Sequence, residues 1–272
     1  MNYYLHIQVS TNTVSVAIFA IASILVVYGV WNAFNIKIIN KEIKSNSLKK
    51  NWVDKKIVLI SDTHLGHMQR SRFSKKMIQL IKKENPDIVL HVGDIIDGPI
   101  FNYEKSFKYF ETLNPPLGFF YVEGNHERYS QDYDSFRKAF PKNIVDMTNS
   151  IKIINDTQII GASFNQNESA EEIKNRIKDL GYDTNIPSIL LLHYPKNNIS
   201  LADLGISLIA SGHTHDGQFF PFNLILKSIY KSQSYGVTYT KENVAITTSG
   251  TGMTFIPMRI GTHSEIVVLK II

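Results

Sequence analysis

Residues 57–66 read Ile57-Val-Leu-Ile-Ser-Asp-Thr-His-Leu-Gly66, an apolar run followed at once by polar residues and a glycine. Such a run, bounded by polar residues, predicts a short buried strand. The same order of apolar run and then acid, amide or imidazole recurs at residues 87–98, 118–127, 189–194 and 208–215. Because open α/β sheets bind ligands beyond the carboxyl ends of their strands, we expect these five ends to converge on one site.

Helical spacing separates several of these runs. The clearest helix is predicted over residues 71–84, whose apolar residues share one face: Phe73, Met77, Ile78 and Ile81. Further helices are predicted at 103–113 and 168–180, and further strands at 151–154, 158–162, 244–247 and 266–271. Early strand–helix alternation followed by strand-rich chain predicts an α/β (α+β) fold in which a two-sheet β-sandwich is flanked by helices.

The composition is that of a globular protein, with 272 residues, 43% hydrophobic and 19% charged. The chain has no cysteine. This excludes disulfides, cysteine-ligated zinc and thiol catalysis, so a metal ion would have to be held by His, Asp, Glu or Asn.

Residues 14–34 form an apolar run that is interrupted only by Ser15, Ser23 and Asn32. About 20 apolar residues match the hydrocarbon thickness of a bilayer, and Tyr28 and Trp31 lie toward one end, where aromatic rings favour the interface. A buried core helix is the alternative, although such helices are usually shorter or carry a polar stripe. The basic start and small-residue cleavage site of a signal peptide are not clear. We therefore expect residues 1–36 to form an N-terminal transmembrane helix that anchors the chain.

The net charge of +5 comes from residues 37–56, where seven lysines face Glu42 and Asp54. This segment is expected to be a basic juxtamembrane linker. The positive-inside rule then predicts a single-pass membrane protein with its main domain, residues 57–272, on the cytoplasmic face, and the lysines could contact anionic headgroups. The body after this segment is formally neutral, whereas a nucleic-acid binder spreads basic charge over its surface, so no nucleic-acid partner is expected.

The polar residues at the five strand ends suit a divalent metal such as Mn, Fe or Zn. In Asp62-x-His64 and His213-x-His215, the spacing lets both side chains point to one face of an extended segment. Any one of these histidines taken alone would more commonly be structural. Together, seven candidate ligands exceed the need of one ion and fit two ions sharing a carboxylate: Asp62, His64, Asp94, Asn125, His193, His213 and His215.

The ordered set resembles the five motifs of calcineurin-like metallophosphoesterases: Asp62-x-His64, Gly93-Asp94-x-x-Asp97, Gly124-Asn125-His126-Glu127, His193 and Gly212-His213-x-His215. The resemblance covers about residues 57–272. The stretches 212–218, 250–252 and 259–261 are similar to a membrane-associated bacterial branch, which includes phosphodiesterases and a UDP-2,3-diacylglucosamine pyrophosphatase. Asp216 stands where that branch often has glycine.

The resemblance implies a two-sheet sandwich and a hydrolase of phosphate esters that uses two divalent metal ions. Asp62, His64 and His215 would hold one ion, and the second would be held by Asn125, His193 and His213. Asp94 would bridge both. His126 would lie at the leaving oxygen, oriented by Asp97, while Glu127 is expected to make local hydrogen bonds.

The reaction implied is hydrolysis of phosphodiester or pyrophosphate bonds at the membrane surface, with a phosphate ester as substrate and lipids among the candidates. A UDP-2,3-diacylglucosamine pyrophosphatase-type activity is the specific alternative. A non-catalytic membrane scaffold is the remote one, and it would predict missing ligands. Residues 219–226 are either core or an apolar loop at the site for lipid or protein contact. His67 lies near enough to Asp62-x-His64 to be considered as a substrate contact. Arg70 and Arg72 are considered as phosphate contacts, with a solvated helix start as the favoured alternative.

Overall fold

The computed structural model describes residues 10–66, 69, 71–98, 102–130, 132–163, 165, 167–195, 198–240 and 243–272. His67 and Arg70 lie outside these residues. Arg72 is exposed at the start of a helix, in agreement with the solvated alternative.

The first sheet has six strands, in the spatial order β1 (Lys37–Ile43), β12 (Glu265–Ile271), β2 (Lys56–Ile60), β3 (Ile88–His91), β4 (Phe119–Tyr121) and β5 (Ile144–Asp146). The four strands from β2 to β5 run parallel to one another. Their carboxyl ends therefore point the same way, which brings the loops that follow β2, β3 and β4 to one edge.

The second sheet also has six strands, in the order β10 (Gly236–Tyr239), β11 (Val244–Thr247), β9 (Leu208–Ser211), β8 (Ser188–Leu192), β7 (Thr157–Ala162) and β6 (Ser150–Ile154). Its four central strands are parallel, and the two outer ones are antiparallel to their neighbours. The predicted strands are confirmed within one or two residues at each end.

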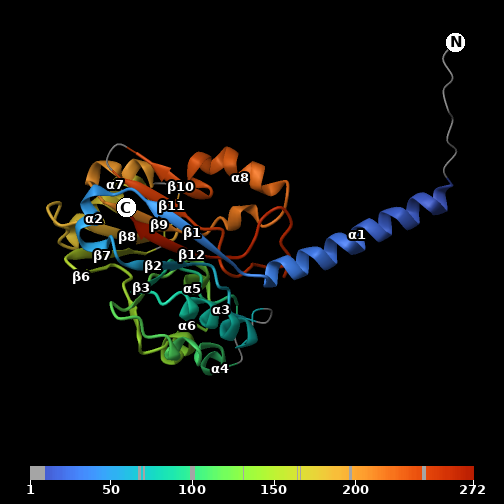
Figure 1. The fold of residues 1–272 in the computed structure, drawn as a ribbon, viewed down its shortest axis with the longest axis horizontal. Helices are drawn as coiled ribbons and strands as arrows, with labels where there is room; N and C mark the ends of the chain where they lie inside the picture. Colours follow the sequence, from blue (N-terminus) through green and yellow to red (C-terminus); the bar gives the residue numbers. More distant parts are fainter. Residues whose placement is uncertain are drawn as a thin grey trace, which may run out of the picture.

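Helices cover the outer faces of both sheets (Figure 1). Against the first sheet pack α3 (Ser71–Lys83), α4 (Tyr103–Phe107) and α6 (Tyr133–Ala139), with the short turns η1 (Phe110–Thr112) and α5 (Asn125–Tyr129) nearby. Against the second sheet pack α7 (Ala170–Asp179) and η3 (Ile199–Leu204). Apolar residues from the inner faces of both sheets form a third cluster between them. The predicted helix-flanked sandwich is confirmed, as is the buried face of α3.

Helix α1 (Thr11–Phe34) projects away from the body (Figure 1). It is long and apolar, and nearly all of its apolar stretch is exposed, so it is a candidate membrane span by length and composition. Its last two turns belong to the body, because Gly29, Asn32 and Ala33 are buried there. The Asn32 amide donates to the carbonyl oxygens of Arg259 (2.9 Å) and Thr262 (2.7 Å).

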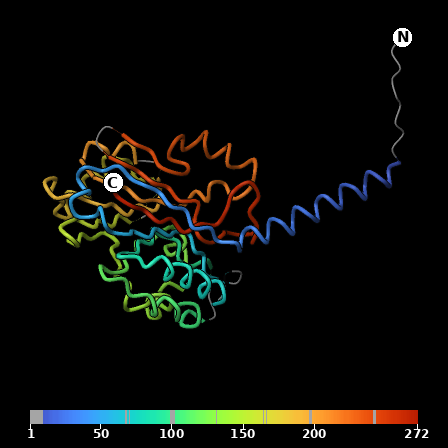
Figure 2. Tube along the Cα trace, viewed as in Figure 1, coloured from blue at the N-terminus to red at the C-terminus, as the bar shows by residue number. Residues whose placement is uncertain are grey.

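Residues 37–56, expected to be a linker, are instead part of the fold. Strand β1 pairs in parallel with β12 along its full length, and the two run side by side in Figure 2. Helix α2 (Asn46–Trp52) follows, with Leu48 and Trp52 buried between the sheets. Strand β1 lies at the edge of its sheet, and charged residues on an edge strand protect it from pairing with other chains. This function accounts for the lysines, which made the segment look like a linker in the sequence.

Residues 219–226 are neither core nor a simple loop. They contain a turn and most of α8 (Phe222–Tyr230), which lies beside η4 (His215–Gly217) and is followed by η5 (Lys231–Gln233). Most side chains of α8 are exposed.

Candidate metal centre

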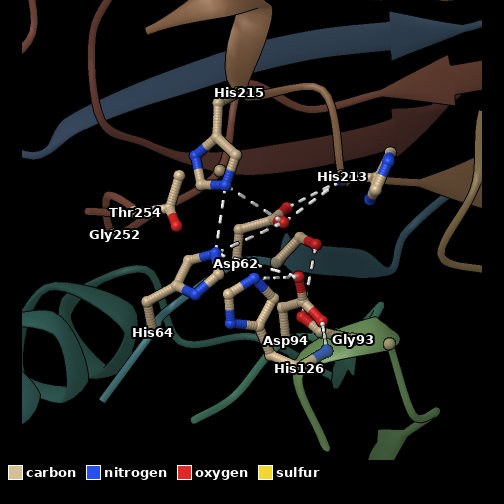
Figure 3. A network of polar contacts seen from close by, with 12 residues as sticks. Asp62, His64, Gly93, Asp94, His126, His213, His215, Gly252 and Thr254 are labelled. Carbon is tan, nitrogen blue, oxygen red and sulfur yellow. Dashed lines mark hydrogen bonds and ion pairs between the residues drawn. The ribbon is translucent and has the colours of Figure 1, made fainter. Parts of the chain in front are cut away.

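The five predicted strand ends meet in one place. The loop after β2 supplies Asp62 and His64, and the loop after β3 supplies Asp94 and Asp97. The start of α5, just beyond β4, supplies Asn125 and His126, while β8 and β9 are followed by His193 and by His213 and His215. In Figure 3 the side chains of Asp62, His64, Asp94, His126 and His215 converge, and His213 lies beside them. The structure therefore brings together the seven candidate metal ligands with His126 and Asp97.

One cluster is formed by Asp62, His64 and His215, all buried. The two imidazole Nε2 atoms lie 3.0 Å apart. Asp62 Oδ1 lies 3.5 Å from His215 Nε2 and 3.8 Å from His64 Nε2. Three donor atoms thus face a common point, which is the arrangement that a bound cation needs.

A second cluster is formed by Asp94, His193 and His213. His193 Nδ1 donates to the carbonyl oxygen of Val92 at 2.6 Å, while its Nε2 lies 3.2 Å from Asp94 Oδ2. Donation from one ring nitrogen to a carbonyl oxygen leaves the other nitrogen available as a ligand. A proton or a cation must therefore lie between Nε2 and the carboxylate.

One further contact adds to the second cluster, and another links it to the first. His213 Nδ1 lies 2.9 Å from Asn125 Oδ1, so the amide adjoins the second cluster as expected. Asp94 Oδ2 also lies 3.8 Å from His64 Nε2. One carboxylate oxygen of Asp94 therefore stands between the two clusters.

The backbone achieves this convergence in a way that the sequence did not predict. Five of the seven candidate ligands have positive φ, between 44° and 71°: Asp62, His64, Asp94, His213 and His215. The expectation that Asp-x-His and His-x-His are extended segments is therefore wrong. Non-glycine residues in this region carry strain, which the surrounding fold must hold and which clusters at functional sites.

Two glycines allow the loops to approach closely. A Cβ on Gly124 would collide with Asp94 Oδ1, and one on Gly212 would collide with the side chains of Ser61 and Asp62. The carboxylates that border both clusters therefore depend on these two positions having no side chain.

The electrostatics of the site fit a bound cation. Burial raises the pKa of Asp62 to about 6, and the nearby Asp94 charge adds to this effect. Burial also lowers the pKa of His64 to about 4 and that of His213 to about 3. At His193, burial alone would lower the pKa, but the charge of Asp94 raises it to about 10. Without an ion, a proton on His193 therefore supplies the positive charge beside Asp94, and divalent ions would take over that role.

His126 and Asp97 form a pair at the edge of the clusters. His126 Nδ1 donates to Asp97 Oδ1 at 2.9 Å, and the imidazole is partly exposed. Partial burial by itself lowers the pKa of His126, but the hydrogen bond to Asp97 and the charge of Asp94 outweigh it and raise the pKa. These contacts favour the imidazolium form of His126, whose Nε2 lies 4.0 Å from Asp94 Oδ2.

Glu127 makes the local hydrogen bonds expected of it. Its buried carboxylate accepts from the backbone amides of Gly124 (2.8 Å), Asp94 (3.0 Å) and Ile96 (3.1 Å). It therefore ties the loop after β3 to the start of α5.

Arg259 is a residue whose role the sequence did not reveal. Its fully buried guanidinium donates to the carbonyl oxygens of His215 (3.0 Å), Ser249 (2.7 Å) and Gly252 (2.8 Å), and Nη2 lies 3.2 Å from His215 Nδ1. The only clue to Arg259 in the sequence was that residues 259–261 are similar to the bacterial branch named above. The position of this stretch in the chain does not relate it to the candidate ligands. We infer that Arg259 positions His215.

Arg259→Ala is expected to weaken metal binding in the first cluster by roughly 10–100-fold, as loss of a residue that orients a ligand commonly does. Calorimetric titration with Mn²⁺ measures this, and the melting temperature reports on folding. The matched control is Arg137→Ala, which removes a surface ion pair with Asp146. Unchanged Mn²⁺ affinity in folded Arg259→Ala would contradict the positioning role.

Known proteins resemble this chain in sequence. Residues 55–217 match the profile of the family described as Calcineurin-like phosphoesterase. An uncharacterized metallophosphoesterase of Campylobacter jejuni is 32% identical over 91% of this chain and 68% of its own length. A Danio rerio protein described as a transmembrane protein with metallophosphoesterase domain is 30% identical over 92% of this chain, which spans only 61% of that relative. The crystal structure of a dimetal phosphatase from Danio rerio has a TM-score of 0.43 and 11% identity, covering 72% of this chain and 87% of that one.

The family match, together with the fold and the paired clusters, identifies a metal-dependent phosphoester hydrolase. The chain belongs to the calcineurin-like phosphoesterase family. Its residue clusters are consistent with a dimetal site, and the candidate span α1 is consistent with association with a membrane.

Proposed function

We propose that this chain hydrolyses phosphodiester or pyrophosphate bonds at a membrane surface, using two divalent ions of the Mn, Fe or Zn type. The observation that carries the proposal is the position of Asp94, whose Oδ2 lies near His64 and His193 and within 4.0 Å of His126 Nε2. Two clusters of donors thus share one carboxylate beside a partly exposed imidazole.

The proposed ligands are Asp62, His64 and His215 for one ion and Asn125, His193 and His213 for the other, with Asp94 shared. When bound, the two ions would act as Lewis acids that activate water and neutralise charge on the phosphoryl oxygens. His126, held by Asp97, gives its Nε2 proton to the leaving oxygen as the phosphorus–oxygen bond breaks.

Lipid-linked pyrophosphates, such as UDP-diacylglucosamine-type compounds, are the second candidate substrates. The exposed apolar side chains of α8, which lies beside η4 and its His215, favour them. A non-catalytic scaffold is disfavoured because all seven donor residues are present and close together.

The test uses the full chain in nanodiscs, loaded in turn with Mn²⁺, Fe²⁺ or Zn²⁺. We expect hydrolysis of bis(p-nitrophenyl) phosphate or of a UDP-lipid to exceed that of a phosphomonoester, with no cleavage of an oligonucleotide. Metal content by mass spectrometry confirms loading. Hydrolysis of monoesters alone by loaded protein would overturn the diester or pyrophosphate assignment.

The cytoplasmic placement is part of the same proposal and follows from the lysines that come after α1. Because the chain lacks cysteine, an exposed Ile153→Cys provides a single label site on β6. An impermeant maleimide should label this variant only after sealed cells are lysed. Labelling of intact cells would place the domain outside.

A further inference from the structure

A set of large apolar side chains lies exposed on one part of the body. They come from α8, from the turn before it and from the loop at residues 255–256. Their exposed fractions lie between 51% and 86%: Phe220, Phe222, Leu224, Ile225, Ile229, Phe255 and Ile256. We call these residues the apolar surface. Contiguous apolar surfaces of this kind mark sites of contact with lipid or protein.

The apolar surface adjoins the point where α1 leaves the body. The backbone amide of Arg259, three residues after Ile256, donates to the carbonyl oxygen of Gly29 in α1 at 2.9 Å. The amide of Phe220 donates to the carbonyl oxygen of Ile260 at 2.7 Å. Segments 219–220, 255–260 and the end of α1 are therefore neighbours, and the loop at 255–258 lies on the side from which α1 projects (Figure 1).

The end of α1 has the features of a membrane interface. Tyr28 and Trp31 are exposed, with ring centroids 6.1 Å apart, and aromatic rings of this kind concentrate at headgroup level. The packing against the body is close, because a Cβ built on Gly29 would lie 3.0 Å from Met258 Cε and 3.2 Å from Ile260 Cγ1. A bilayer crossed by α1 would therefore begin next to the loop that carries Phe255.

We propose that the apolar surface is a second membrane contact, in which α8 and the 255–256 loop insert into the same bilayer leaflet that α1 enters. The occupant is phospholipid: apolar side chains enter the boundary between headgroups and acyl chains, as in interfacial amphipathic helices. Lys227 and Lys231, both exposed at the end of α8 and just after it, provide cationic groups for anionic headgroups.

This contact would fix the position of the metal clusters relative to the lipid. Gly217, at the end of η4, packs against Asn223 of α8. Tyr230 of α8 lies edge-on to Tyr194 at 5.8 Å between ring centroids, and Tyr194 lies edge-on to His213 at 4.8 Å. Only one or two residues therefore separate α8 from His215 of the first cluster and His213 of the second. This contact between the apolar surface and phospholipid does not depend on which phosphate ester the site hydrolyses.

The test uses the natural absence of cysteine. Full-length Ile225→Cys, Ile229→Cys and Phe255→Cys are spin-labelled and placed in phosphatidylethanolamine–phosphatidylglycerol nanodiscs. Electron paramagnetic resonance then compares collision of each label with oxygen, which concentrates in lipid, and with water-soluble chromium oxalate. We expect oxygen to dominate at these three positions.

Ile153→Cys is the matched control, because Ile153 is an apolar residue, 58% exposed, on edge strand β6 of the second sheet. Its label should collide mainly with chromium oxalate. If the three test labels behave like the control, the surface faces water and the proposal fails. If they are shielded from both agents and two copies give a label–label distance, the surface is a dimer interface and the proposal also fails. Neither outcome bears on hydrolysis, which is measured separately.

Discussion

Asp94→Asn is expected to reduce the metal content of the purified protein from two ions per chain to one or none. The carboxylate is the acidic group shared by both clusters, with Oδ2 3.2 Å from His193 Nε2 and 3.8 Å from His64 Nε2. The amide keeps the shape of the side chain and can still accept from the His126 backbone amide, which lies 2.9 Å from Oδ1. The variant therefore removes charge from the site with little change in packing.

Two measurements check this expectation. Mass spectrometry counts the ions, and calorimetry with Mn²⁺ should show affinity lowered by more than the roughly 10–100-fold that follows loss of a residue outside the ligand set. Asp203→Asn is the control, because it makes the same chemical change at a surface ion pair with Lys174. Two ions bound with normal affinity by Asp94→Asn would remove Asp94 from the bridging role.

His126→Ala is expected to keep both ions and to lower kcat by roughly 10²–10⁴-fold, the range for loss of a group that transfers a proton. The backbone amide of residue 126 still donates to Asp94, so the loop should keep its position. The loss should be smaller for nitrophenyl esters, whose acidic leaving group needs less protonation. Equal losses for acidic and basic leaving groups would argue against proton donation and favour a role in holding phosphate.

Asp97→Asn completes this experiment. Asp97 contacts the imidazole through a 2.9 Å hydrogen bond, so its loss should lower kcat less than loss of His126. In the His126→Ala background, Asp97→Asn should cause no further decrease, because residues that act through one group are not additive. A further decrease in the double variant would show that Asp97 acts independently.

Much of the site could be predicted because strand ends are visible in a sequence. Short apolar runs such as 57–60 and 88–90 are followed by polar residues that are unusual in a core. Parallel strands bring these residues to one edge. The helix at 71–84 was equally clear from its apolar face. These features depend on local patterns, so the sequence alone displays them.

Other features depend on contacts made far along the chain. Strand β1 is charged and pairs with β12, more than 200 residues away, so its sequence resembles a linker. The positive φ values of Asp62 and His215 arise where loops converge, and no spacing encodes them. Arg259 reaches His215 from a separate loop. In each case tertiary packing overrides the local pattern.

The hydrogen bonds between the end of α1 and the loop at 259–264 have a consequence for encounters with substrate. A domain on a flexible tether loses rotational freedom each time it engages a surface, and that lost entropy weakens the engagement. Here Asn32 and Gly29 join helix and body, so that entropy is lost once, during folding. Where α1 spans a bilayer and the substrate lies in that bilayer, as proposed above, the metal clusters keep one orientation toward it. The effective concentration of the substrate is then set by its density in the leaflet rather than by that in bulk water.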